Sequence, residues 1–323
     1  MNTKKLQVLA TSKLSGVAGL MRYSTRAPPP AYLLLMVTHR CNLGCSFCNQ
    51  KALMREGGGK EMDLETVKEI ESNIDFLYKP RIHLFGGEPT VHEDIDEIID
   101  FFDSKGYRLS MTTNGTNHGW IGEDEVDKLD EVNISVNLEE YEYVKEAVEK
   151  INSYENPPSI NVNCPLSPAN HGRLTEIAWD FKGLDIASLV FQHLIWSRDE
   201  SFNEEVDVET VKNQMEKVRE MDIPATFFPP VKKEDIQDYY RNPDFPGTKC
   251  LAPWLRMEIL PSGEVASCKW LVPDQDVVVG DAVSEELSSI WNGSRFREIR
   301  GRIRDEGVYE DSYCHRCCFR RYR

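Results

Sequence analysis

The sequence contains no apolar run long enough to cross a bilayer. Its longest apolar stretch covers residues 31–37, whereas a membrane-spanning helix needs ~20 residues. Basic residues are also in deficit, because 38 Lys and Arg face 54 Asp and Glu, a formal net charge of −16. Such a surface repels a phosphate backbone, so the composition argues against general nucleic-acid binding.

Acidic residues are missing from the first part of the chain. From Met1 to Arg55 there are eight Lys or Arg residues and no Asp or Glu. Residues 4–23 have a helical period, and their apolar arc consists of Leu6, Leu9, Ala10, Leu14, Val17, Leu20 and Met21. We therefore expect residues 1–30 to form a basic amphipathic segment that either caps the following domain or contacts an anionic membrane surface.

The nine cysteines are an odd number and stand in close sets. This pattern favours metal ligation in a reducing compartment over disulfides, so we expect a cytoplasmic location. Cys41, Cys45 and Cys48 directly follow the apolar run 31–37. Three thiolates leave one iron of a 4Fe-4S cluster open to bind something other than protein. A zinc site is the alternative, but no Cys or His pair follows within thirty residues to complete it.

Strand-like and helix-like segments alternate after residue 31. We expect strands at 32–38, 81–85, 108–112, 132–136, 160–163 and 187–192, and helices at 63–76, 94–105, 123–129, 140–151 and 171–182. Six strands with helical crossovers predict a parallel sheet, whose reactive groups gather at the carboxyl ends of the strands. A helix at 208–221 and the run 225–228 then lead the chain away from the sixth strand.

The spacing of the first three cysteines, with Phe47 just before the last, resembles the cluster motif of the radical S-adenosylmethionine (SAM) superfamily. The resemblance implies an α/β fold, a partial (β/α)6 barrel over 31–235. It also implies that Cys41, Cys45 and Cys48 hold a 4Fe-4S cluster that binds SAM, that Phe47 contacts this cofactor, and that a flavodoxin- or ferredoxin-type protein supplies the electron. Cleavage of SAM in this superfamily gives a 5'-deoxyadenosyl radical that removes a hydrogen atom from the substrate.

Further motifs stand at the ends of later strands. Gly86-Gly87-Glu88-Pro89 resembles the superfamily segment that binds the methionine amine, and close backbone approach at the glycines suits this role. Asn114 after the third strand, and Ser135 and Asn137 after the fourth, complete the set of residues that the resemblance assigns to the cofactor. Many relatives have Asp where this chain has Asn137, so a charged carboxylate is not available there.

Two other side chains are candidates for catalysis. Cys164, in the fifth strand, is a candidate hydrogen-atom donor to a product radical, with a small buried residue as the alternative. His193, in the sixth strand, is a candidate acid or base. A lone His beside apolar neighbours is more often a hydrogen-bonded structural residue, so both interpretations stay open.

A second cysteine set, Cys250, Cys268, Cys314 and Cys317, occupies the C-terminal third. A β-hairpin at 256–260 and 264–269 brings its first two members together. The pattern resembles the twitch domain, a shortened SPASM domain, which implies one auxiliary 4Fe-4S cluster in a small α+β domain over 236–323. Structural zinc is the alternative. Cys318 has no assigned role.

These features predict a radical SAM enzyme that abstracts a substrate hydrogen atom, for oxidation or bond formation assisted by the auxiliary cluster. The non-enzyme alternative is a zinc-binding scaffold protein. A small molecule such as an alcohol or sugar, a ribosomally made peptide and a lipid remain open as substrates. The 30 N-terminal residues are too short for a fused peptide-leader-binding domain, whereas the basic amphipathic segment favours a lipid.

Overall fold

The computed structural model describes residues 24–45, 47–48, 50, 60–117, 119–120, 122–136, 141–193, 205–242, 250–268, 277–307, 314 and 317. The helix expected at 4–23, Asn137 and Cys318 lie outside these residues. Within the described part of the chain, no helix combines the length and apolar character needed to cross a membrane.

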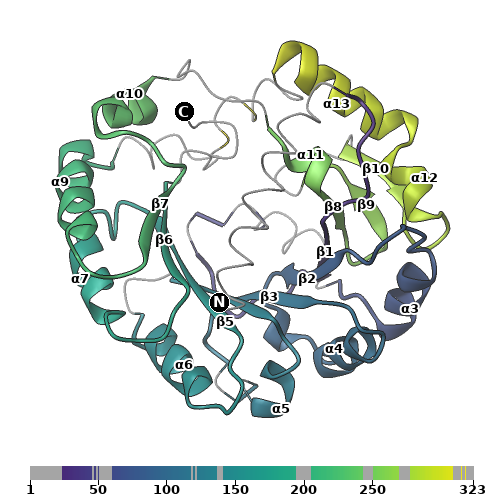
Figure 1. Cartoon of the computed structure of the whole chain (residues 1–323), viewed down its shortest axis with the longest axis horizontal. Coiled ribbons are helices and arrows are strands. Elements are labelled where there is room, and N and C mark those ends of the chain that lie inside the picture. The colour runs from purple at the N-terminus through teal and green to yellow at the C-terminus, as the bar shows by residue number, and fades with distance from the viewer. Residues whose placement is uncertain are drawn as a thin grey trace, which may run out of the picture.

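A curved parallel sheet forms the centre of the protein. Among the described residues the strands of its barrel part, in chain order, are β1 (Tyr32–Thr38), β2 (Arg81–Gly86), β3 (Leu109–Thr113), β4 (Glu131–Ser135), β5 (Ser159–Leu166), β6 (Ser188–His193) and β7 (Ala225–Phe228), each parallel to the next. The strands form an open arc, which confirms the α/β class and the partial barrel (Figure 1). The run 225–228 does not leave the sheet as expected, because β7 pairs with β6 as a further parallel strand.

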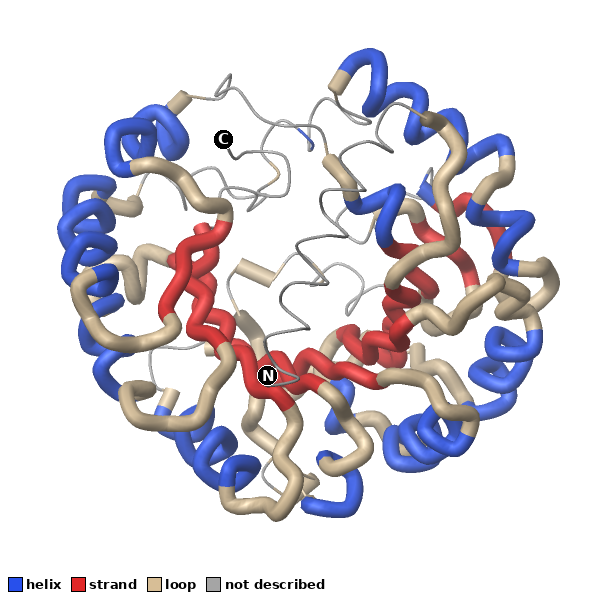
Figure 2. The backbone as a smooth tube through the Cα atoms, viewed as in Figure 1, coloured by secondary structure: helices blue, strands red, loops and turns tan. Residues whose placement is uncertain are grey.

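Helices cover the convex side of this sheet (Figure 2). They are α3 (Leu64–Ser72), α4 (Ile95–Ser104), α5 (Glu123–Val126), α6 (Glu142–Asn152), α7 (Leu174–Asp180), α9 (Val208–Arg219) and, after a 3-10 turn η2 (Lys233–Asp235), α10 (Ile236–Arg241). The Asp63 carboxylate caps α3 by accepting from the Thr66 N–H at 2.8 Å. In α4 the buried stripe of Ile95, Ile98, Ile99 and Phe102 faces the sheet.

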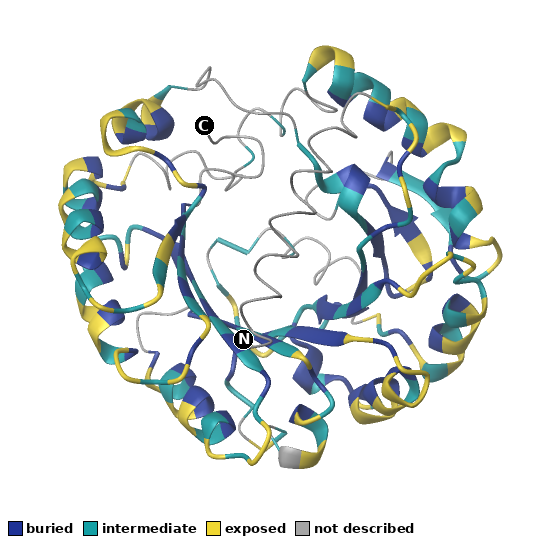
Figure 3. Cartoon of the chain, viewed as in Figure 1, coloured by how far each residue is buried: buried dark blue, intermediate teal, exposed yellow. Residues whose placement is uncertain are grey.

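Successive strand residues point to opposite faces of the sheet. Leu33, Leu35 and Val37 of β1 belong to the large core that contains the helix side chains. Leu34 and Met36 belong to a second, smaller cluster on the concave face. Figure 3 shows the burial that results, with exposed residues on the outer surfaces of the helices. Side chains that line the interior of the barrel therefore come from alternate strand positions.

The C-terminal part continues the sheet at its other edge. β8 (Arg256–Ile259) pairs parallel with β1, and β9 (Glu264–Ala266) and β10 (Val278–Asp281) follow antiparallel. The β8–β9 pair is the hairpin expected from the sequence. The described residues of this part also form the helices α11 (Ala252–Leu255), α12 (Leu287–Trp291) and α13 (Ser294–Glu306). The hairpin of the second cysteine set is thus built directly onto the first strand of the barrel.

Candidate active site

The first cysteine set leaves the carboxyl end of β1, where parallel sheets gather reactive groups. The side chains of Cys41, Cys45 and Cys48 are half-buried. The Cys48 N–H donates to the Cys45 carbonyl oxygen at 3.2 Å, which closes a turn between them. Burial raises the pKa of the Cys41 thiol, and the charges of Glu88 and Cys48 raise it further. A cationic metal centre would offset this crowding of negative charge, so the residues fit an iron-sulfur cluster.

The segment Gly86-Gly87-Glu88 packs against the backbone that leads into the cysteine loop. The Gly87 N–H donates to the Thr38 carbonyl oxygen at 2.8 Å. The Glu88 N–H donates to the Arg40 carbonyl oxygen, also at 2.8 Å. A Cβ added at Gly87 would lie 1.9 Å from that Arg40 oxygen, and one at Gly86, whose φ is +150°, would lie 2.3 Å from the Thr38 oxygen. The two glycines allow a backbone junction that no larger residue permits.

Glu88 joins the β2 loop to the end of β3. Its side chain is buried, with a relative exposure of 1%. The carboxylate accepts hydrogen bonds from the Thr113 hydroxyl at 2.6 Å, the Asn114 N–H at 2.6 Å and the Thr90 hydroxyl at 2.7 Å. Burial raises the pKa of Glu88, and these donors oppose the rise. Binding of the methionine amine by Glu88 stays a prediction, because the carboxylate here holds protein groups together.

Arg40 and Asn42, which lie on either side of Cys41, extend this junction, although no sequence motif identified them. The Asn114 amide donates to the Asn42 Oδ1 at 2.8 Å, and its own Oδ1 accepts from the Thr116 hydroxyl at 2.6 Å. The Arg40 Nε donates to Glu61 at 2.9 Å. The only sequence signal was that Arg40 and Asn42 flank the first cysteine. The carboxyl ends of β1, β2 and β3 thus form one hydrogen-bonded unit around the cysteine loop.

The other residues expected at the cofactor lie nearby or outside the described part. Phe47 is half-buried next to Cys48 in the cysteine loop, and Pro89 opens the 3-10 turn η1 (Pro89–Val91) after Glu88. Ser135 is the last residue of β4 and pairs in register with Asn163 of β5. Asn137 is not among the described residues. The role of each toward the cofactor remains a prediction.

Cys164 and His193 do not point into the barrel. Both are fully buried, and Cys164 belongs to the large core between sheet and helices. The alternation of a strand instead directs their half-buried neighbours Asn163 and Gln192 to the concave face. The His193 Nδ1 lies 2.8 Å from the Tyr240 hydroxyl of α10. Neither side chain therefore faces the interior of the barrel.

The burial of His193 predicts that the folding stability of the protein decreases in acid. Burial, and then the charge of Arg219, lowers its pKa to about 3. Between this value and the unfolded value of ~6.5, the unfolded state binds a proton that the folded state excludes. The contribution is fully present above pH ~6.5 and declines as the pH falls. Between about pH 8 and about pH 5, His193 should lower the unfolding free energy of the wild type by about 2 kcal/mol. In His193→Gln, denaturant unfolding should show a decrease that is smaller by this amount. An unchanged pH dependence would contradict this.

The second cysteine set surrounds the start of the C-terminal hairpin. Cys250 precedes α11, and Cys268 follows β9. The Cys317 N–H donates to the Cys314 carbonyl oxygen at 3.2 Å. Burial raises the pKa of Cys250 to about 12, and the charges of Cys317 and Cys314 add to the rise while Arg256 opposes it. These thiols share one electrostatic environment with a nearby cation, which fits a centre ligated by several thiolates.

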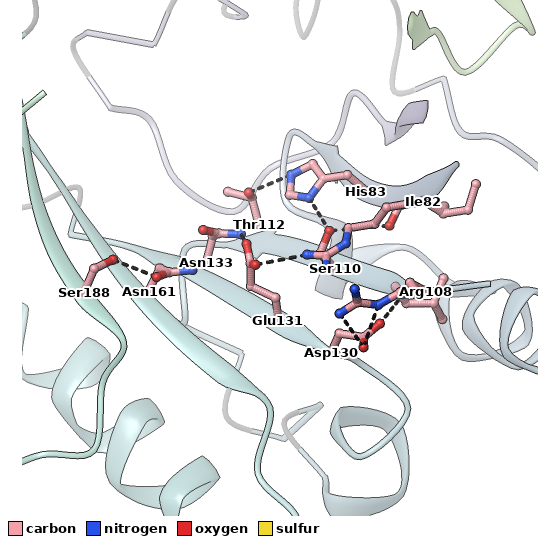
Figure 4. Close-up of polar contacts among 12 residues, drawn as sticks. Ile82, His83, Arg108, Ser110, Thr112, Asp130, Glu131, Asn133, Asn161 and Ser188 are labelled. Carbon is pink, nitrogen blue, oxygen red and sulfur yellow. Dashed lines mark hydrogen bonds and ion pairs between the residues drawn. The ribbon is translucent and has the colours of Figure 1, made fainter. Parts of the chain in front are cut away.

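Hydroxyl and imidazole groups line the concave face of β2 and β3 (Figure 4). His83, in the middle of β2, places its Nδ1 2.9 Å from the Ser110 hydroxyl and its Nε2 3.0 Å from the Thr112 hydroxyl. Ser110 and Thr112 alternate with Met111 of the outer core, so both hydroxyls face inward. The imidazole is fixed in orientation by two neighbours on the adjacent strand.

The polar lining continues across β4, β5 and β6 (Figure 4). Glu131 accepts from Arg81 at 3.1 Å and from the Asn133 amide at 3.1 Å. The Ser188 hydroxyl donates to Asn161 at 2.7 Å. The first cysteine loop follows the carboxyl end of β1. The second set adjoins Arg256, which pairs with Tyr32 at the amino end of β1. The polar interior therefore lies between two cysteine sites at opposite ends of the barrel.

Comparisons with known proteins agree with this arrangement. Family models match the radical SAM superfamily over 35–157 and an iron-sulfur cluster-binding SPASM domain over 250–318. A probable GTP 3',8-cyclase from Methanothermobacter marburgensis is 38% identical over 89 residues, 27% of this chain and 28% of that protein. The chain likewise spans only 43% of a second such protein from Methanothermobacter thermautotrophicus. A PqqA peptide cyclase from Xanthomonas axonopodis pv. citri is 24% identical and covers 85% of this chain and 78% of that protein.

Solved structures share the fold over most of the chain. Streptococcus suis SuiB bound to S-adenosylmethionine has a TM-score of 0.62 at 16% identity, over 89% of this chain and 70% of that one. SuiB bound to its precursor peptide SuiA has the same TM-score and identity, over 85% and 67%. The two family models coincide with the two cysteine sets. The chain therefore carries a radical SAM superfamily domain, which implies S-adenosylmethionine and a 4Fe-4S cluster, and a SPASM domain, which implies auxiliary iron-sulfur ligation.

Proposed function

We propose that this enzyme abstracts a hydrogen atom from a peptide held in the polar interior of its barrel, and so oxidises the peptide or forms a bond within it. The observation that carries the proposal is the placement of a polar lining between the two cysteine sites. When bound, the first cluster and SAM would supply the 5'-deoxyadenosyl radical that takes the hydrogen atom. The auxiliary cluster would accept the electron that remains on the substrate.

The chain's own residues hold and orient the cofactor. Cys41, Cys45 and Cys48 are the cluster ligands, and the junction of Gly87 with the cysteine loop fixes the backbone beside them. Glu88 holds the β3 end in place through its buried carboxylate. Because these contacts join protein atoms only, they hold the cysteine loop in a defined position. Such preorganisation supports productive geometry at the reacting carbon.

The interior suits a substrate with many hydrogen-bonding groups. His83 on β2, Asn133 on β4 and Asn161 on β5 are half-buried, so their polar groups can pair with a ligand in the interior of the barrel. A peptide backbone carries both donors and acceptors at regular intervals and matches such a wall. The extensive similarity to a PqqA peptide cyclase supports this substrate class over the nucleotide of the GTP 3',8-cyclases, whose similarity is confined to a shorter segment.

The test compares two substrates with the reduced, reconstituted enzyme and SAM. One is GTP, and the other is a synthetic peptide whose sequence is chosen from a search for short reading frames beside the gene. We expect the peptide, and not GTP, to raise 5'-deoxyadenosine formation and to lose two hydrogen atoms by mass spectrometry. Asn133→Leu should weaken this modification while leaving substrate-free cleavage of SAM in place. Modification of GTP with no change in the peptide would overturn the peptide assignment.

A further inference from the structure

The register of the C-terminal hairpin brings a charged pair beside the second cysteine set. Glu258 pairs with Ala266, and Ile259 pairs with Val265, in an antiparallel ladder. The same register, continued by two residues, sets Arg256 opposite Cys268. Residues directly opposite in an antiparallel pair project from the same face of the sheet. Arg256 and Cys268 are therefore neighbours on the concave side.

Arg256 and Glu258 form an ion pair in a protected position. The Arg256 Nε lies 3.1 Å from Glu258 Oε1, and the Glu258 side chain is only 2% exposed. On the other side of β8, Glu258 pairs in register with Leu34 of β1, which belongs to the small apolar cluster of the concave face. Charges in such surroundings are screened far less than at the surface. The charges of Arg256 and Glu258 can therefore act on the second cysteine set next to them.

Arg256 stands next to cysteines that come from both ends of the hairpin. Cys250 precedes α11, which ends at Leu255 directly before Arg256, and Cys268 follows β9. Together with the hairpin register, this placement identifies Arg256 as the charged group beside the second cysteine set.

We propose that the Arg256–Glu258 pair sets the reduction potential of the auxiliary iron-sulfur cluster. Reduction adds one negative charge to a cluster, and nearby charge is one of the main determinants of cluster potential. The guanidinium of Arg256 stabilises the reduced form and raises the potential, whereas the carboxylate of Glu258 opposes it. Both are positioning residues that act through the cluster. The inference rests on the auxiliary cluster and not on the identity of the substrate.

The experiment measures the potential by a redox titration followed by electron paramagnetic resonance in the full reconstituted enzyme. The auxiliary signal is the one that addition of SAM leaves unchanged. We expect Arg256→Gln to shift its midpoint to a more negative value and Glu258→Gln to shift it to a more positive one. Arg256→Lys, which keeps the charge, should stay close to wild type. Arg108→Gln, which removes a cation from the exposed Arg108–Asp130 pair, should produce no shift.

Iron content distinguishes tuning from a structural role. Opposite shifts at wild-type iron content support the proposal. Shifts of the same sign in both Gln variants, or no shift with iron retained, would overturn it. If Arg256→Gln loses iron, the other two variants decide the question. A more positive midpoint potential in Glu258→Gln, with a near-wild-type potential in Arg256→Lys, supports the proposal. Equal loss of iron in all three variants refutes it. None of these outcomes depends on whether a peptide is modified.

Discussion

Simultaneous replacement of Cys41, Cys45 and Cys48 by Ala should abolish the formation of 5'-deoxyadenosine from SAM. Iron should fall from about eight to about four atoms per chain, as expected when one of two 4Fe-4S clusters is lost. The physical reason is that these thiols are the ligands offered at the carboxyl end of β1, and no other cysteine lies within this loop. Chromatographic detection of 5'-deoxyadenosine under strong reductant, with iron and sulfide analysis, makes the measurement.

Two matched variants control this experiment. Cys164→Ala removes a free thiol that is fully buried in the outer core, so iron and SAM cleavage should stay at wild-type levels. Removal of Cys250, Cys268, Cys314 and Cys317 should also lower iron to about four atoms per chain while the first cluster remains. If that second variant keeps its iron and releases zinc instead, the auxiliary assignment fails. Cleavage of SAM by the triple variant would disprove the first assignment.

The sequence predicted the elements whose pattern is local. The run 32–38 forms β1 with the expected bounds because its residues are apolar on both faces of a sheet that is covered on its outer side. Most helices are shorter than expected by a few residues at one or both ends, as for α3, because helix ends depend on caps such as Asp63 and Asn73. The hairpin of β8 and β9 was also predictable, since its turn contains Gly263 with φ of +86°.

Features that depend on distant partners were not predictable. The four-residue strand β7 has too short a pattern to reveal its pairing with β6, and β8 joins β1 although they are more than 200 residues apart in the sequence. Strand register determines which face of the sheet Cys164 and His193 occupy, because a shift of one residue exchanges the two faces. The motif residues came together as expected at the ends of β1, β2 and β3. The partners of Glu88, however, could be identified only from the fold.

Gly87→Ala is the single substitution expected to harm this site most. The added Cβ would lie 1.9 Å from the Arg40 carbonyl oxygen and 2.5 Å from its carbon. Both are backbone atoms, so no side chain can rotate away and the two loops must separate. That separation breaks the hydrogen bond from the Glu88 N–H to Arg40 and displaces the cysteine loop. Because a misplacement of ~1 Å at a reacting site can cost about 100-fold, we expect SAM cleavage to fall by at least this factor.

Gly301→Ala is the matched control for this change. Its Cβ would meet the nearest atom, Thr25 Cγ2, at an ordinary distance of 3.7 Å. Gly301 lies within α13, where Ala is favoured over Gly by about 1 kcal/mol. This variant should therefore keep full SAM cleavage and unfold at an equal or higher temperature. For Gly87→Ala, iron content separates two effects: normal iron with slow cleavage indicates a displaced SAM site, whereas loss of iron indicates that the junction is needed to assemble the cluster. Wild-type cleavage in Gly87→Ala would show that close packing of the two loops is not required for SAM chemistry.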